Sequence, residues 1–266
     1  MIAVDTALDP VFGDLSSGAN YDLILGMAKG GAIAASLTGP PCETFSAARN
    51  IKLEGESGPR PLRTREAPWC LHNRNPRELR QVDTGTELMF NSLQVEVSVA
   101  QAGGGSLMEH PAEPQADEKV SVWRLQCHTD WCMKIREACQ HRVDQWLYGA
   151  AGVKPTTLRA LHLGPPEVVG RALIDGAEPW RTRPTCGLRG RGSDGRFLTA
   201  RAKEYPSALC RSILVAVLKG LRHRIHRDGV AEFFSPDLAQ LKWLTHMCSQ
   251  SEAFTLQSYL PDYQRS

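Results

Sequence analysis

Two consecutive prolines, Pro40 and Pro41, end a short apolar run and place a cysteine directly behind it. The run, at 32–37, has the length and composition of a buried strand in a parallel sheet. Because proline donates no backbone hydrogen bond, the chain must leave the sheet at this point. In open α/β sheets, ligands bind in the crevice outside the carboxyl ends of the strands. The pattern therefore predicts an α/β fold in which Cys42 lies on a crevice loop.

Composition supports a globular chain of one principal domain. The 266 residues are 42% hydrophobic and 23% charged, close to an average soluble protein. These values exclude disordered and fibrous classes. A chain of this length can bury the core of one α/β domain with a small appendage.

The eight cysteines are scattered, and no secretory signal precedes them. This usage favours free thiols in a reducing compartment over a disulfide framework. We therefore expect an intracellular protein, nuclear if its cell is eukaryotic. No apolar run approaches the ~20 residues that cross a bilayer, so we expect no membrane partner.

Helical and strand-like spacings alternate along the chain. In the first half they predict a strand tail at 1–4, a helix over 21–29, a strand over 32–37, a long polar loop over 50–83 with one short helix at 76–80, a helix over 84–101 and a strand over 106–108. In the second half they predict a helix over 118–140, a strand over 142–148, a loop over 153–159, an irregular module over 164–195, a helix over 204–224 and a further helix near 236–249.

The cysteine loop carries the strongest resemblance to a known family. Taken alone, Cys42 is better explained as a small buried thiol beside a Pro-Pro turn. The whole string at 39–46, Gly-Pro-Pro-Cys-Glu-Thr-Phe-Ser, resembles the catalytic loop of the DNA cytosine-5 methyltransferases. The resemblance implies that Cys42 is the nucleophile that adds to cytosine C6. It also implies that Pro40 lies at the cofactor and Ser46 at the substrate.

A glutamate follows the next predicted strand, in the tripeptide Glu109-His110-Pro111. The family carries Glu-Asn-Val or a related tripeptide there, so its role passes to Glu109 only. That role is a hydrogen bond or proton at cytosine N3, which a carboxylic acid can supply when desolvation raises its pKa. The alternative is a solvated glutamate at a strand end.

Two later stretches extend the resemblance. The string at 144–149 followed by Lys154-Pro155-Thr156 is similar to phage-like and retroelement-borne members of the family. The wider family has Gln-x-Arg-x-Arg here, which implies that Lys154, Thr156 and Arg159 contact the substrate. A plain strand-to-loop connection is the alternative. The stretch at 199–210 resembles the last family segment, in which a Tyr-Pro pair opens a helix that returns toward the cofactor.

The family uses S-adenosylmethionine as methyl donor, and the resemblance implies the same cofactor here. Asp5 would hold its ribose, and Asp14 would lie near its adenine. The family's first motif, an aromatic-x-Gly-x-Gly turn, is not found, and the glycines at 103–105 are explained as a helix stop. We therefore expect the chain to begin after the family's first strand and helix, with the methionine pocket half built. It would act as a monomer or depend on the missing segment.

These inferences combine into one expected architecture. It is a Rossmann-like methyltransferase sheet with helices on both faces, incomplete at the amino end, plus a small irregular recognition module. The divisions are a partial catalytic core over 1–163, a target-recognition module over 164–198, a returning helix over 199–227 and a helical tail over 228–266. Arginines of the module and of the residues directly after it would contact DNA phosphates. They are Arg181, Arg183, Arg189, Arg191, Arg196 and Arg201. A mixed solvated surface is the alternative.

Three competing interpretations remain. A metal site is suggested by the soft ligands Cys127, His128, Cys132, Cys139 and His141. No Cys-x-x-Cys pair accompanies them, so we favour core packing and predict no metal. A nucleic-acid-binding remnant of a mobile-element polyprotein would retain the fold without catalysis. A cysteine hydrolase would need a histidine base, for which His110 is the nearest candidate.

Overall fold

The computed structural model describes residues 13–16, 18–46, 49, 59–132, 135, 137–184 and 204–228. A sheet of four strands forms its centre: β1 (Ala35–Thr38), β2 (Gly105–Pro111), β3 (Cys139–Asp144) and β4 (Pro155–Leu161), in the order β1-β2-β4-β3. β1 is parallel to β2, whereas β4 is antiparallel to both β2 and β3. β1, β2 and β3 therefore share one direction, and β4 opposes them. The predicted α/β class is confirmed, with a mixed sheet.

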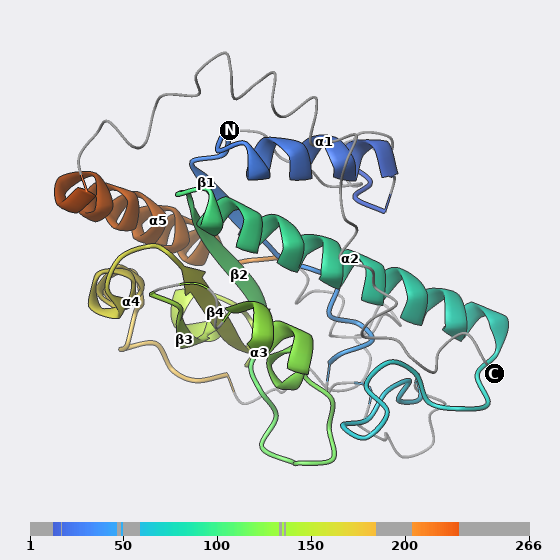
Figure 1. Ribbon diagram of the computed structural model, residues 1–266. Coiled ribbons are helices and arrows are strands. Elements are labelled where there is room, and N and C mark those ends of the chain that lie inside the picture. The colour runs from blue at the N-terminus through green and yellow to red at the C-terminus, as the bar shows by residue number, and fades with distance from the viewer. Residues whose placement is uncertain are drawn as a thin grey trace.

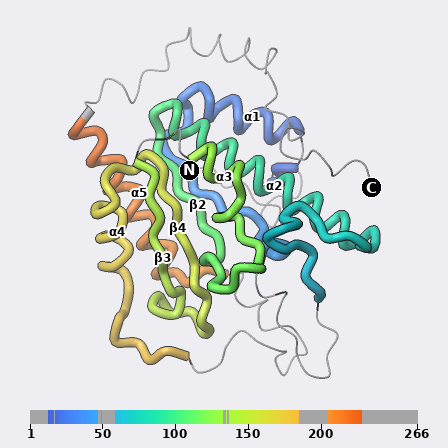
Figure 2. Tube along the Cα trace, turned by 60° about the horizontal axis from the view of Figure 1, so that its bottom comes forward, coloured from blue at the N-terminus to red at the C-terminus, as the bar shows by residue number. Residues whose placement is uncertain are grey.

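Helices cover both faces of this sheet. They are α1 (Gly18–Lys29), α2 (Pro76–Gln101), α3 (Gln126–Cys132), α4 (Pro166–Asp175) and α5 (Ser207–Asp228), with short 3-10 helices η2 (Val122–Arg124) and η3 (Gln145–Tyr148). α2 and α3 lie on one side, with α1 packed outside α2, and α4 and α5 lie on the other (Figures 1 and 2). Among the described residues, no helix combines the length and apolar character needed to span a membrane.

Strand alternation divides the core into two clusters. Met108 and Leu161 pack with residues of α2 and α3, whereas Leu107 and Leu158 pack with residues of α4 and α5. Successive side chains of a strand point to opposite faces. Glu109 therefore shares the α5 face with Leu107.

The start of α2 corrects the predicted loop over 50–83. Pro76 and its neighbours begin one continuous helix that runs through the expected helix at 84–101. Its start is a capping box: the Asn75 side chain accepts a hydrogen bond from the Glu78 amide, and the Glu78 carboxylate accepts one from the Asn75 amide. These bonds satisfy two backbone donors that a helix start leaves unpaired. The sequence predicts loop with one short helix for the first turns of α2 because their residues are mostly polar, although Val82 is fully buried.

Three predictions in the second half are also wrong. The helix expected over 118–140 is reduced to η2 and α3, and the strand β3 already begins at Cys139. The loop expected over 153–159 is largely the strand β4, which starts at Pro155 because the first position of a strand tolerates proline. The irregular module expected from residue 164 contains the regular helix α4.

Other predicted elements are confirmed with small shifts in their bounds. They are the helix at 21–29 (α1), the strands at 32–37 (β1) and 106–108 (β2), and the helix at 204–224 (α5). The strand predicted at 142–148 is β3 up to Asp144, and it continues as η3. The strand tail at 1–4 and the helix near 236–249 lie outside the described residues.

Candidate functional site

Three of the predicted site residues, Cys42, Glu109 and Lys154, lie at one edge of the sheet. β1, β2 and β3 run in the same direction, so their carboxyl ends meet at this edge, where the opposing strand β4 begins. Cys42 follows β1, Glu109 lies near the end of β2, and Lys154 immediately precedes β4. Gln145, the first residue after β3, lies at the same edge.

Glu109 is surrounded by hydrogen-bond donors. Its carboxylate is buried, and the Tyr205 hydroxyl donates to its Oε2 atom at 2.6 Å. Its Oε1 atom lies 3.6 Å from the Lys154 ammonium and 3.4 Å from Gln145 Nε2. Gln145 Nε2 also donates to Thr156 Oγ1 at 2.9 Å, so this amide bridges Glu109 and Thr156. Both carboxylate oxygens of Glu109 therefore face hydrogen-bond donors.

Cys42 is a half-buried free thiol within the electrostatic range of the same groups. Burial raises the pKa of Cys42, the Lys154 ammonium lowers it, and the Glu109 carboxylate raises it. The net direction is upward, so the resting site holds a thiol. Since the thiolate is the nucleophilic form, Lys154 is the cation that favours its formation.

The aromatic residue of the cysteine loop anchors it to the protein. Phe45 is buried, and the centre of the Arg63 guanidinium lies 3.9 Å from its ring centroid. Arg63 is itself held by Val82 of α2, whose carbonyl accepts a hydrogen bond at 2.8 Å. The Phe45 amide donates to the Cys42 carbonyl at 3.1 Å, which closes the loop into a tight turn. The half-buried Ser46 follows directly, and its carbonyl accepts a bond from the Arg49 amide.

Arg159 lies on the opposite face of the sheet. In the β2–β4 register Arg159 is paired with Met108, whereas Glu109 is paired with Leu158. The Arg159 guanidinium is buried and forms an ion pair with Glu96 of α2. The structure therefore brings Lys154 and Thr156 to Glu109 but places Arg159 in the core.

Two of the residues considered as metal ligands contact Arg159 instead. His128 and Cys132, one turn apart on α3, both contact the Arg159 guanidinium. On β3, Cys139 Sγ lies 3.4 Å from His141 Nε2. Within the described part of the chain, no group of three or more His, Cys, Asp or Glu side chains could hold a metal ion.

His110, the candidate base of a cysteine hydrolase, is fully buried against the ring edges of Phe45 and Trp123. Among the described residues, neither of its ring nitrogens has a hydrogen-bond partner. Burial, aided by the Lys154 charge, lowers the pKa of His110 to about 3. Its position next to Glu109 in the strand turns its ring to the other face. His110 therefore serves core packing rather than proton transfer with Cys42.

The three residues predicted to bind the cofactor, Asp5, Asp14 and Pro40, differ in where they lie. Asp5 lies outside the described residues. The Asp14 carboxylate accepts hydrogen bonds from the amide and hydroxyl of Ser16 at 2.9 and 2.7 Å. Pro40 is buried beside the cysteine loop. Asp14 thus stabilises a local turn and Pro40 packs inward, and neither arrangement alone recognises S-adenosylmethionine.

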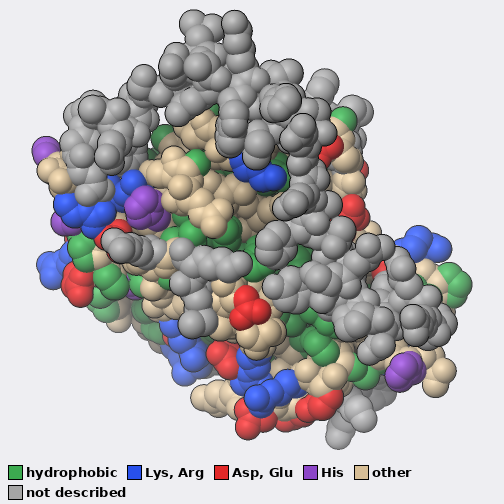
Figure 3. Space-filling view, viewed as in Figure 1, with side chains coloured by type: hydrophobic (Ala, Val, Ile, Leu, Met, Phe, Trp, Pro, Cys, Tyr) green, Lys and Arg blue, Asp and Glu red, His purple; other side chains and the backbone are tan. Residues whose placement is uncertain are grey.

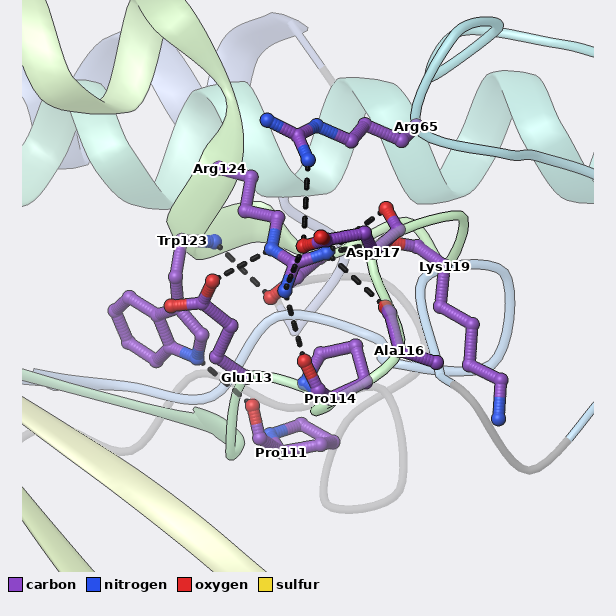
Figure 4. Close-up of polar contacts among 10 residues, drawn as sticks. Arg65, Pro111, Glu113, Pro114, Ala116, Asp117, Lys119, Trp123 and Arg124 are labelled. Carbon is purple, nitrogen blue, oxygen red and sulfur yellow. Dashed lines mark hydrogen bonds and ion pairs between the residues drawn. The ribbon is translucent and has the colours of Figure 1, made fainter.

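One arginine organises the loop that follows Glu109 (Figure 4). The Arg124 guanidinium pairs with Glu113 and donates to the carbonyls of Pro114, Ala116, Asp117 and Lys119. The indole of the neighbouring Trp123 donates to the Pro111 carbonyl at 2.8 Å, which fastens the end of β2 to η2. The Arg124 guanidinium is therefore bound by groups of the protein itself and stabilises the loop after β2.

Gln145 and Tyr205 were not predicted as site residues. Both lie in strings that carry the family resemblance, but nothing in their local spacing shows that their side chains reach Glu109. Tyr205 is separated from Glu109 by 96 positions in the chain, so only tertiary packing brings them together.

Geometry and chemistry define the site as a cysteine, a carboxylate and a lysine at the carboxyl edge of an α/β sheet. The chain matches no family model, and none of the curated proteins or solved structures compared with it matches either. The functional argument therefore rests on these residues and their surroundings.

Proposed function

We propose that this chain is a DNA cytosine-5 methyltransferase with a Rossmann-like core, in which Cys42 forms a covalent adduct with the target cytosine. The observation that supports the proposal most is the ion pair of Lys154 with Glu109 at 3.6 Å, next to a Cys42 thiol whose pKa both charges influence. It joins a nucleophile, a carboxyl group and a cation at the edge where α/β sheets bind ligands.

The residues have distinct roles in this reaction. Cytosine C5 is too weak a nucleophile to accept a methyl group until a thiolate adds at C6 and converts the ring to an enamine. Lys154 favours the Cys42 thiolate, and Glu109 supplies a proton or hydrogen bond at N3 as charge develops in the ring. S-adenosylmethionine would supply the methyl group. Loss of the C5 proton to water and cleavage of the C6–S bond then regenerate Cys42.

The substrate would be DNA with the target base turned out of the helix, because C6 of a stacked cytosine is out of reach of a loop cysteine. Arg183 and Arg181 are exposed beyond α4 and are candidates for phosphate contacts, although Arg181 also pairs with Glu178. Arg124 and Arg159 are committed to internal contacts. On the face shown in Figure 3, positive and negative side chains are interspersed over the described surface. Binding would therefore depend on a local cluster and weaken with salt.

Methyl transfer tests the proposal. Wild-type protein incubated with DNA and labelled S-adenosylmethionine should produce labelled 5-methylcytosine, detected after digestion to nucleosides. Cys42→Ala should produce none, whereas Cys70→Ala, which removes another partly exposed thiol, should retain the activity. Product formation by Cys42→Ala would contradict the proposal.

A second candidate function is a nucleic-acid-binding remnant of a mobile-element polyprotein without catalysis. The observation in its favour is the Asp14 carboxylate, which Ser16 engages at a position where the resemblance implies adenine. Titration calorimetry separates the two functions. Heat on addition of S-adenosylmethionine supports the enzyme, and DNA binding without such heat supports the remnant.

A further inference from the structure

The Tyr205 hydroxyl lies where three separate segments of the site meet. It donates to Glu109 Oε2 on β2 at 2.6 Å. A Cβ atom built on Gly39, in the cysteine loop, would lie only 3.0 Å from the same hydroxyl. The Lys154 ammonium lies 5.1 Å from the centroid of the Tyr205 ring. The segment that precedes α5 is therefore an integral part of the site.

Tyr205 acts as a constant hydrogen-bond donor. Burial raises the pKa of Tyr205, and the charge of Glu109 raises it further. The phenol therefore keeps its proton at neutral pH. Its backbone is fixed because α5 begins two residues later and buries Leu209 and Ile213 in the core.

The contacts of Glu109 are unequal. The bond from Tyr205 to Oε2 is short, whereas Gln145 and Lys154 approach Oε1 at 3.4 and 3.6 Å. Hydrogen bonds to a carboxylate are strongest at about 2.5 to 2.7 Å when the donor is a hydroxyl. Tyr205 therefore sets the orientation of the carboxyl group and leaves Oε1 as the less tightly held oxygen.

We propose that Tyr205 is a positioning residue for Glu109, and this inference rests on the proposed function. It holds Oε2 so that Oε1, on the side of Lys154, is the oxygen presented to the cytosine ring. A carboxyl group misplaced by about 1 Å can cost on the order of 100-fold in rate, so loss of this one hydroxyl should be visible in the chemical step.

The test is a double-mutant cycle on adduct formation. DNA that contains 5-fluorocytosine is mixed at saturation with S-adenosylmethionine and the protein, and the rate constant of the covalent adduct is measured for wild type, Tyr205→Phe, Glu109→Gln and the double variant. Tyr205→Phe keeps the ring over which Lys154 lies, and it should slow the adduct roughly 10- to 100-fold. The DNA dissociation constant should change by less than about twofold, because the base contacts remain. The double variant should be no slower than Glu109→Gln alone.

Tyr148→Phe is the matched control. The Tyr148 hydroxyl donates to the Leu173 carbonyl at 2.9 Å in the α4 and α5 layer, and this bond involves neither Glu109 nor Cys42. This variant also loses one buried phenol bond, but it should form the adduct at the wild-type rate. A slowdown shared by both variants would indicate general destabilisation and overturn the positioning role.

Other outcomes are equally decisive. A wild-type rate in Tyr205→Phe, or rate losses that multiply in the double variant, overturns the inference while the proposed function stands. Absence of any adduct with wild-type protein overturns the proposed function itself. If Tyr205→Phe does not fold, Gly39→Ala provides the second variant, since its methyl group displaces the hydroxyl and should slow the adduct similarly.

Discussion

Lys154 interacts with two acidic groups of the site, Glu109 and Cys42. Its ammonium lies 3.6 Å from Glu109 Oε1, and it also lowers the pKa of Cys42. While Glu109 is ionised, its charge opposes formation of a second anion at Cys42. Protonation of Glu109 removes that opposition. The charge arrangement therefore links activation of the thiol to the state of the carboxyl group.

This arrangement predicts opposite pH shifts for two substitutions. Alkylation by iodoacetamide follows the thiolate fraction, which increases with pH. Lys154→Met removes the stabilising cation, so half-maximal alkylation of Cys42 should move up by about one pH unit. Glu109→Gln removes the opposing charge and should move it down. The rate is followed by mass spectrometry of the peptide that contains Cys42.

Lys219→Met serves as the control, because Lys219 lies on α5 and pairs with Asp175, outside the site. Its profile should match the wild type. A downward shift for Lys154→Met would contradict the assigned role of Lys154.

At the scale of elements, a buried ion pair fastens α2 to the sheet. Arg159 of β4 pairs with Glu96 of α2, whose carboxylate also accepts a hydrogen bond from Thr38 of β1. Burial raises the pKa of Glu96, and Arg159 is the largest opposing influence. Removing one partner leaves the other charge buried without compensation.

Arg159→Met should therefore lower the free energy of unfolding by about 3 to 5 kcal/mol. The double variant Glu96→Gln/Arg159→Met should recover part of this loss, because no uncompensated charge remains. Urea denaturation followed by circular dichroism gives both values. An Arg159→Met protein as stable as wild type would contradict the core role and restore Arg159 as a candidate for substrate contact.

The elements that the sequence predicted correctly are those with local signals. α1 and α5 have apolar helical spacing, Pro40 and Pro41 follow the end of β1, and Pro111 is the last residue of β2. β4 was mistaken for a loop because Lys-Pro-Thr resembles a turn, and its pairing with β2 and β3 is not visible locally.

In the candidate site, too, some features follow from local sequence motifs and others depend on tertiary packing. Cys42, Glu109 and Lys154 each follow from a local motif, and the structure brings them together. The contact of Tyr205 with Glu109 and the burial of Arg159 depend on how α5 and α2 pack against the sheet. Neither could be inferred from spacing.

At the scale of the whole molecule, two histidines are buried where the sheet packs against α2 and α3. They are His110 of β2 and His128 of α3. Burial lowers the pKa of His110 to about 3 and that of His128 well below its usual range. An unfolded histidine takes up its proton near pH 6.5. Between these values the unfolded chain binds more protons than the folded one, so stability is fully present above about pH 6.5 and decreases as the pH falls toward 3.

His110→Phe should weaken this pH dependence. Phenylalanine keeps the aromatic contacts with Phe45 and Trp123 but cannot take up a proton. Wild type should lose about 3 kcal/mol more than the variant between pH 7 and pH 4. His72→Gln, a substitution of an exposed histidine, should behave as wild type in the same urea titrations. Equal losses in wild type and His110→Phe would contradict the account.

The central claim is that Cys42 forms a covalent bond with cytosine. Its most direct measurement is mass spectrometry of the protein after incubation with S-adenosylmethionine and DNA that contains 5-fluorocytosine. The account predicts an adduct on the peptide that carries Cys42, and no adduct for Cys42→Ala. Continued covalent trapping by Cys42→Ala, or an adduct located on another cysteine, would contradict it.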